Sequence, residues 1–222
     1  DSNGLILITL KVAEECIQRK AIVYDSDEDE HYDTISAFIK SMRGCDVDAT
    51  LYWLAKMIHA GEDPRFIARR IVIHAAEDVG LADPMALVLA NAAFQASELI
   101  GWPEARIPIA EAAIYIAGAH KSNSVIKAID AALQDVRSNK SIPVPSHLKD
   151  SHYTGSEKLG RGKDYQYTHD YAGNFVAQDY LGAKRRFYEP TEQGVEKKIK
   201  ARVDYWREQF ARLSDGKREN KK

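Results

Sequence analysis

The stretch that decides the fold contains three helix-sized segments, one after another: DVDATLYWLAKMIHAG (residues 46–61), DPRFIARRIVIHAAEDVG (63–80) and DPMALVLANAAFQASELIG (83–101). Each segment begins with an aspartate, whose carboxylate can accept hydrogen bonds from the free N–H groups of a first helical turn. In two of them a proline follows, at a position where a missing N–H costs nothing. Each ends with a glycine, which readily takes the left-handed conformation that ends a helix. These repeated start and stop signals predict a helical array.

The sequence before the array predicts two further helices, over residues 5–23 and 31–43, and a loop between them. Residues 31–43 have apolar side chains at helical spacing, and Gly44 follows them. The acidic run DSDEDE (residues 25–30) resembles half of a calcium-binding loop, but it lacks the glycine and the final glutamate that such a loop requires. We therefore expect residues 25–30 to form a solvated loop.

The sequence after the array predicts three more helices and one irregular segment. Pro108 is expected to begin a helix that runs to about residue 119, and Ser122 is expected to cap a helix that runs to about residue 137. Residues 141–190 are rich in glycine and tyrosine, so we expect an irregular arm held to the helices by its aromatic side chains. A last helix is expected over residues 192–213, and residues 214–222 read as a disordered tail.

The composition sets broad limits on function. The 222 residues carry a formal net charge of −2, so no overall field attracts the chain to DNA or to a membrane. Cys16 and Cys45 form no CxxC pair, which is typical of a reducing, cytosolic setting. The uncharged run over residues 84–97 is too short to cross a bilayer, which takes about 20 residues. Because the chain begins at Asp1 rather than at a methionine, we expect it to be a piece of a longer protein.

Two neighbouring helices are nearly free of charge. Residues 84–97 contain no charged residue, and the helix over residues 108–119 contains only Glu111. A helix that is apolar on all sides must be buried on all sides. Either these helices form the interface of a homo-oligomer, or both are central helices of a single domain. For the first case the candidate interface residues are Leu87, Leu89, Phe94, Ile109, Ile114 and Tyr115.

One polar cluster permits two interpretations. Arg70, His74, Glu77 and Asp78 lie along one stripe of the second segment. Helical metalloproteins use a glutamate and a histidine at this spacing, so a metal-dependent hydrolase that uses His74, Glu77 and Asp78 is an alternative. Such proteins need a second pair of the same kind, and the sequence offers none. The pattern therefore favours an ordinary network of arginine, histidine and carboxylate, with no metal.

The sequence predicts no catalytic residue and no cofactor site. Gly160-Arg-Gly-Lys163 suggests a phosphate loop, but the pattern G-x-x-x-x-G-K-[ST] is not met, and no apolar strand precedes it. The chain also lacks a G-x-S-x-G motif and a cysteine in a setting typical of a nucleophile.

Basic residues near aromatic ones give partial support to nucleic-acid binding, because tyrosines can stack on bases. Residues 141–190 nevertheless hold seven Lys/Arg against six Asp/Glu, so solvated charges and ion pairs are the alternative interpretation. The candidate DNA contacts are Arg65, Arg69, Arg70, Lys158, Arg161, Lys163, Arg185 and Arg186.

Several short sequences together resemble one known family. They are HYDTISAFIKSMRG (31–44), LYWLA (51–55), GEDP (61–64), IARR (67–70), EDVGLADP (77–84), PEARI (103–107) and KSN (121–123). Over about residues 13–210 the chain closely resembles the C-terminal half of the replication-associated recombination protein A family. That family is also called MgsA, and its eukaryotic relative is the Werner helicase-interacting protein.

The resemblance implies a AAA+ ATPase related to clamp loaders, which acts at stalled replication forks. Residues 1–24 would be the tail of the ATPase lid, and residues 25–213 an all-α tetramerisation domain similar to a clamp-loader collar. ATP and Mg²⁺ would belong to the parent chain, since no Walker A or Walker B motif is present here. The implied partners are further copies of the chain, single-stranded or forked DNA, single-strand-binding protein and other replisome proteins. The implied location is the cytoplasm, near the nucleoid, with no membrane contact.

Overall fold

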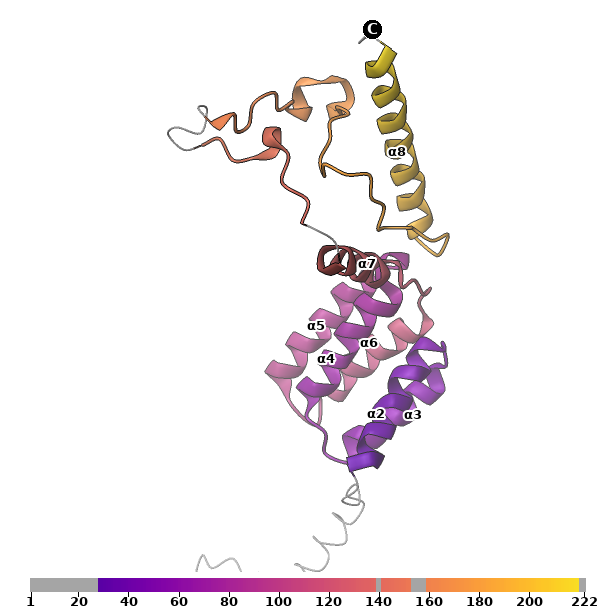
Figure 1. Cartoon of the computed structure of the whole chain (residues 1–222). Helices are drawn as coiled ribbons and strands as arrows, with labels where there is room; N and C mark the ends of the chain where they lie inside the picture. The colour runs from indigo at the N-terminus through magenta and orange to yellow at the C-terminus, as the bar shows by residue number, and fades with distance from the viewer. Residues whose placement is uncertain (1–27, 139–140, 153–158, 220–222) are drawn as a thin grey trace, which may run out of the picture. The chain divides into compact units, whose positions relative to one another are not determined.

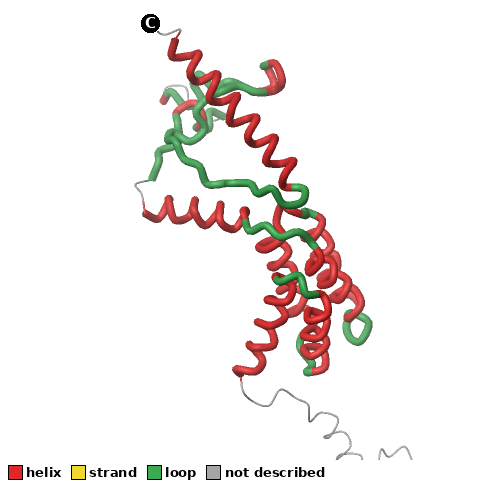
Figure 2. Tube along the Cα trace, turned by 90° about the vertical axis from the view of Figure 1, so that its right-hand side faces the viewer, coloured by secondary structure: helices red, strands yellow, loops and turns green. Residues whose placement is uncertain are grey.

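The computed structural model describes residues 28–138, 141–152 and 159–219, which divide into two compact units between Asn123 and Ser124. The described residues form helices and irregular segments without a β-strand, which confirms the predicted all-α class (Figures 1 and 2). No helix among them has the length and apolar character needed to cross a membrane. The expected lid tail, residues 1–24, lies outside the described residues. The sequence predicted a single helical domain over residues 25–213 and did not predict this division into two units.

Unit 1 is a helical bundle with α6 at its centre (Figure 1). Its elements are α2 (Glu28–Arg43), α3 (Val47–His59), α4 (Pro64–His74), the π-helix η1 (Ala75–Val79), the 3-10 turn η2 (Gly80–Ala82), α5 (Met85–Ile100) and α6 (Arg106–Gly118). The central helix α6 contacts α2, α3, α4 and α5, and α2 packs along α3.

The predicted capping aspartates and terminal glycines have the expected conformations in the structure. The carboxylate of Asp46 accepts a hydrogen bond from the N–H three residues on, and those of Asp63 and Asp83 accept from the N–H two residues on. The three glycines that end the segments all have positive φ: Gly61 (83°), Gly80 (52°) and Gly101 (70°). The helical array therefore follows from local sequence.

Two predicted boundaries need correction. Helix α2 begins at Glu28, so the end of the acidic run is helical rather than a loop. The physical reason is that carboxylates stabilise a helix N-terminus, and Lys56 from α3 lies 2.8 Å from the Glu30 carboxylate. Helix α6 begins at Arg106, which places Pro108 inside the first turn, where a proline is tolerated.

Small residues allow α4, α5 and α6 to approach closely. Helix α5 buries only one face, and that face consists of Ala86, Ala90, Ala93 and Ser97. Helix α6 buries Ile109, Ala112, Ala113, Ile116 and Ala117. Of the two nearly uncharged helices, α6 is thus a central helix of the protomer, whereas α5 is an outer helix with apolar side chains left in solvent.

Unit 2 contains two helices joined by the long arm. Its elements are α7 (Ser124–Ser138), the short turns η3 (Ser146–Leu148), η5 (Thr168–Asp170) and η6 (Ala172–Asn174), and α8 (Glu196–Glu219). Helix α7 begins two residues after the predicted cap Ser122, whose N–H donates to the Asp78 carbonyl within unit 1 (2.7 Å). Helix α8 starts later than expected and includes residues 214–219, so the prediction of a disordered tail is wrong for those residues.

Aromatic contacts hold the predicted irregular arm to α8. The ring of Phe175 stacks on Trp206 at a centroid distance of 4.8 Å and meets Phe210 edge-on at 4.9 Å. Tyr180 also approaches Phe210, at 6.2 Å. Because such pairs favour stacked and edge-on geometry, these rings explain how a segment with little regular structure keeps a defined path.

A fully buried carboxylate links the N-terminal ends of α7 and α8. Glu196, the first residue of α8, accepts hydrogen bonds from the hydroxyls of Ser124, Tyr188 and Thr191. Burial, and then the bond to Glu196, raises the pKa of Tyr188 to about 12. The contact joins the first residue of α7 to the first residue of α8.

Candidate self-association surface and nucleic-acid contacts

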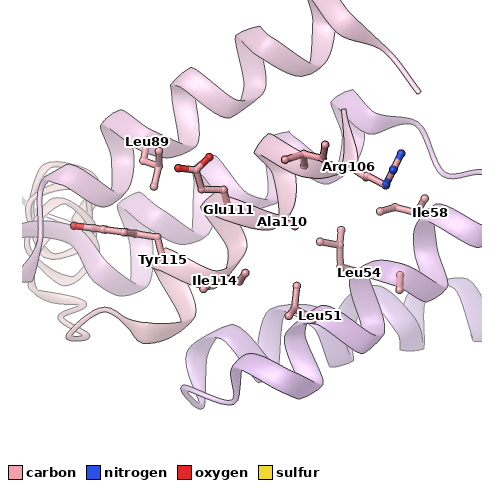
Figure 3. A pocket seen from close by; sticks show the side chains of 11 residues that line it. Leu51, Leu54, Ile58, Leu89, Arg106, Ala110, Glu111, Ile114 and Tyr115 are labelled. Atoms are coloured by element: carbon pink, nitrogen blue, oxygen red, sulfur yellow. The ribbon is translucent and has the colours of Figure 1, made fainter. Parts of the chain in front are cut away.

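Unit 1 carries an open apolar groove of about 690 Å³ between α3 and α6 (Figure 3). Its wall from α3 consists of Leu51, Leu54, Ala55 and Ile58, and the other side is formed by Leu89 of α5 and by Arg106, Ile107, Ala110, Glu111, Ile114 and Tyr115 of α6. Only two lining residues are charged. An apolar hollow of this kind on a folded protomer is typical of a surface that binds another protein segment.

The shape of the groove follows from side-chain size. Leu54 is nearly buried (2% exposed), whereas Ile107 and Ile114 on α6 are 60% and 43% exposed. The small Ala110 lies between these two isoleucines in the sequence of α6, so it leaves a depression between larger side chains. No described segment of unit 1 covers these isoleucines. The groove is therefore open to solvent.

The predicted interface residues differ in their exposure to solvent. Leu87, Ile114 and Tyr115 are exposed at 43%, 43% and 36%, whereas Leu89 and Phe94 are half-buried. Leu89, Ile114 and Tyr115 line the groove. Ile109 must be removed from the set, because its side chain is fully buried in the core of its own protomer.

Tyr115 closes one end of the groove, and Arg106 and Ile58 lie at the other end (Figure 3). The Tyr115 hydroxyl donates to the carboxylate of Asp83 (2.8 Å), and this hydrogen bond raises the pKa of Tyr115. Because Asp83 also accepts from the first turn of α5, the tyrosine ring is held in place between α5 and α6.

Sequence reasoning missed two sets of apolar surface residues. The first set is the rest of the groove, above all Leu51, Ile58 and Ile107. The second set is the exposed stripe of α7: Val125, Ile129, Leu133 and Val136. Their helical spacing was visible in the sequence. Spacing alone, however, shows that a helix has an apolar face, and not whether the same protomer covers that face.

His74 and Asp78 belong to a polar network with Arg43. Arg43 of α2 donates to both oxygens of the Asp78 carboxylate (Nε–Oδ1 2.7 Å, Nη2–Oδ2 3.0 Å). His74 Nδ1 lies 2.8 Å from Oδ2 of Asp78, but neither ring nitrogen has a well-aligned hydrogen bond to a described residue. The described residues contain no group of His, Cys, Asp and Glu arranged to hold a metal. Because the Arg43 guanidinium occupies both oxygens of Asp78, the geometry gives no support to the alternative of a metal-dependent hydrolase at His74, Glu77 and Asp78.

The predicted network exists, but with a different arginine. We expected Arg70 to pair along the helix, whereas the partner of Asp78 is Arg43 from another helix. After His74 the helix continues as a π-helix, in which the N–H of Gly80 donates to the carbonyl of Ala75, five residues back, and His74 and Asp78 still lie 2.8 Å apart. The buried Nε of Arg70 has no hydrogen-bond partner among the described residues.

The predicted DNA contacts on α4 do not form one patch. Arg65 and Arg69 are exposed and, four residues apart, share a face of the helix. Arg65 pairs with Asp63 (3.2 Å), and the Arg69 guanidinium lies over the ring of Phe66 (6.0 Å). Arg70, half-buried, lies on another side of the helix. Only Arg65 and Arg69 are therefore positioned together.

The predicted DNA contacts on the arm gather partly around a second groove, of about 670 Å³ in unit 2. This arm groove is lined by Lys184, Arg185, Arg186, Tyr180, Phe210 and four neighbouring residues of the arm. Arg185 pairs with Asp135 (3.2 Å) and Arg186 with Glu189 (2.9 Å), while Lys184 is exposed. Lys163 is exposed and Arg161 half-buried, away from this lining, and Lys158 lies outside the described residues.

Comparison with known proteins identifies the family. The model of the "MgsA AAA+ ATPase C terminal" family matches residues 44–207, and that of an "AAA C-terminal domain" matches residues 1–43. Replication-associated recombination protein A of Bacillus subtilis is 49% identical over 87% of this chain and 46% of its own length. The Escherichia coli K12 protein of the same name is 38% identical over 94% of this chain and 48% of its own length.

A eukaryotic protein is also similar. The protein named ATPase WRNIP1 of Dictyostelium discoideum is 40% identical over 79% of this chain and 20% of its own length. The chain spans about half the length of the bacterial relatives. The predicted resemblance is thus confirmed by both kinds of comparison. This chain belongs to the MgsA, or replication-associated recombination protein A, family of AAA+ ATPases.

Proposed function

We propose that this chain is the C-terminal self-association module of a AAA+ ATPase of DNA replication and recombination, and that it assembles into a homotetramer. The observation that carries the proposal is the open groove of unit 1, with Ile107 and Ile114 exposed on a helix that carries one charge after its first residue. Apolar surface of this kind is unfavourable in water and is stabilised when a partner covers it. Family membership supports the role in replication and recombination.

Sedimentation velocity tests the assembly directly. At micromolar concentration we expect the 24.9 kDa chain to sediment as a tetramer, and to dissociate gradually on dilution. A chain that sediments as a monomer throughout the micromolar range would refute the proposal.

The other features of the family are proposals for the whole protein. We propose that it binds ATP and Mg²⁺ outside these 222 residues, which lack the G-x-x-x-x-G-K-[ST] motif. We further propose that it works in the cytoplasm near the nucleoid, at stalled forks, with single-strand-binding protein and other replisome proteins as partners. The names of the bacterial relatives support the link to replication and recombination.

A second role, contact with single-stranded or forked DNA, is supported by the arm groove. Lys184 and Arg186 lie there beside Tyr180, which is 44% exposed. Basic side chains can neutralise phosphates, and an exposed ring can stack on an unpaired base. Both arginines form an ion pair, but Arg185 contributes less, because its side chain is 40% exposed against 57% for Arg186, and its partner Asp135 is 20% exposed against 65% for Glu189.

The double variant Lys184→Ala/Arg186→Ala is expected to weaken binding of a single-stranded oligonucleotide at low salt. If both residues contact phosphates, the slope of log K against log [salt] should become shallower by roughly 1.4, from about 0.7 for each contact. Fluorescence anisotropy at several salt concentrations measures both quantities. Lys127→Ala, an exposed lysine of α7 outside the arm groove, is the control. An unchanged slope in the double variant would exclude the arm groove as the site.

A further inference from the structure

We propose that the arm groove of unit 2 binds an unpaired base on the ring of Tyr180, and that Gln178 is the residue that positions this ring. The inference rests on the proposed contact with DNA and names what the groove recognises, which is an unpaired base together with its phosphates. It follows from three observations: the charges of the lining, the exposure of the Tyr180 ring, and the hydrogen bonds of Gln178.

The first observation is that the arm groove combines positive charge with aromatic surface. Its lining holds one acidic residue, Asp179, against three basic ones, Lys184, Arg185 and Arg186. The Asp179 carboxylate is already occupied, because its Oδ1 accepts from the N–H groups two and three residues further on, at 3.0 and 2.7 Å. The lining is therefore positive on balance, which suits the phosphates of a nucleic-acid strand.

The second observation is that the Tyr180 ring is exposed and yet held in one place. It is 44% exposed. Its plane lies nearly perpendicular to that of Phe210 from α8, at 86° and a centroid distance of 6.2 Å, and both rings line the arm groove. The chain just before it is anchored, since Val176 and Ala177 are buried. A ring that is already ordered loses little conformational entropy when a base stacks on it.

The third observation is that Gln178 uses both ends of its amide to hold the hydroxyl of Tyr180. Its Nε2 donates to the Tyr180 hydroxyl (2.9 Å) and to the carbonyl of Gln166 (2.8 Å), and its Oε1 accepts from the N–H of Gln166 (3.3 Å). Exchange of the two ends of the amide would place one N–H against another, so a single orientation is selected. Gln178 thus joins two stretches of the arm and fixes the ring between them.

A ring in this position selects a single strand for a physical reason. The face of a base is free for an aromatic side chain only where the base is unpaired and unstacked, and every base has such a face. Lys184 and Arg186 lie in the same groove, so stacking and phosphate contact occur side by side. Phosphate contact depends strongly on salt, whereas stacking carries no charge. The two contributions can therefore be measured separately.

Binding of an oligothymidylate and of an abasic strand of the same length tests the stacking role. The abasic strand keeps the phosphates and lacks the bases, so the unmodified chain should bind it about 5- to 150-fold more weakly. Tyr180→Leu should weaken binding of the oligothymidylate by a similar factor, leave the abasic strand unaffected, and leave the slope of log K against log [salt] unchanged. Tyr171→Leu removes a ring that is 41% exposed outside the arm groove and is the matched control, with no effect expected on either strand.

A double-mutant cycle tests the positioning role of Gln178. Gln178→Met and Tyr180→Phe each break the hydrogen bond between the two side chains, and each should weaken binding of the oligothymidylate by roughly fivefold. In a chain that already carries Tyr180→Leu, Gln178→Met should have no further effect, because the ring that it positions is absent. Fluorescence anisotropy gives the dissociation constants, and thermal unfolding checks that each variant is folded.

The outcomes separate stacking, positioning and the DNA contact itself. Equal affinity of the unmodified chain for the two strands would overturn stacking without the need for any variant. If Gln178→Met weakens binding equally with and without the Tyr180 ring, Gln178 acts only on the fold of the arm, and its positioning role is overturned. Full affinity in Tyr180→Phe, which keeps the ring, would overturn that role as well. An unmodified chain that binds neither strand at low salt would instead refute the proposed contact with DNA.

Discussion

The substitutions Ile114→Arg and Ile109→Arg are expected to have opposite consequences, although the two residues lie on the same helix. Ile114 is 43% exposed at the wall of the groove, so an arginine there can extend its charge into solvent and unit 1 stays folded. A charge in an apolar interface weakens assembly, and we expect a loss of roughly 100-fold in self-association. Ile109 is fully buried. An unpaired charge there costs several kcal/mol, comparable to a total stability of about 5–15 kcal/mol, so unit 1 should unfold.

Circular dichroism and sedimentation velocity together separate these outcomes. Ile114→Arg should keep the helical signal and sediment as a smaller species, whereas Ile109→Arg should lose helical signal at 25 °C. Ile114→Val and Ile109→Val are the controls, with losses of stability expected to stay near about 1 kcal/mol or less. A tetramer that persists in Ile114→Arg would show that the groove is not the self-association surface.

Unit 1 is expected to lose stability steeply as the pH falls from 6.5 towards 4, because of His74. Burial lowers the pKa of His74 from 6.5 to about 4; the negative Asp78 opposes this shift, while Arg43, Lys121 and Arg70 add to it. The unfolded chain therefore binds a proton below pH 6.5 that the folded chain does not bind until about pH 4. This contribution to stability is fully present above pH 6.5, and at pH 4.5 the loss should reach roughly 2–3 kcal/mol.

The variant His74→Leu isolates this effect from other titrating groups. It removes two buried ring nitrogens that lack well-aligned hydrogen bonds, so little stability should be lost at pH 7. Urea unfolding at pH 7 and pH 4.5 measures the free energy of unfolding for both proteins. The difference in the free energy of unfolding between the two pH values should be roughly 2–3 kcal/mol smaller in His74→Leu. An equal pH dependence in both proteins would mean that folding does not shift the pKa of His74.

The candidate site shows where sequence reasoning reached its limit. Periodicity correctly indicated that α5 and α6 are rich in apolar residues, but it placed Ile109 and Ile114 in one interface. The two residues differ in burial because Ile109 lies on the side of α6 that faces the core and Ile114 on the side that faces solvent. Which side faces the core depends on α2, α3, α4 and α5, all of which contact unit 1's central helix. No pattern within α6 contains that information.

The polar cluster shows the same limit. The sequence placed Arg70 with His74 and Asp78, since a regular helix aligns residues four apart. His74 and Asp78 do lie together, at 2.8 Å, but the arginine that pairs with Asp78 is Arg43, 35 positions away in the chain. The sequence could not show that the Arg43 guanidinium occupies both carboxylate oxygens of Asp78.

The amino-acid sequence by itself determined that unit 1 is helical and where its three array segments begin and end, from caps such as Asp46 and Asp63 to the glycine at Gly101. These features depend on hydrogen bonds between residues at most a few positions apart, so local sequence is sufficient. The tertiary structure alone decided which apolar side chains remain exposed, that a groove opens between α3 and α6, and that Arg43 neutralises Asp78. These outcomes depend on packing between segments far apart in the chain, where many side chains must be placed at once.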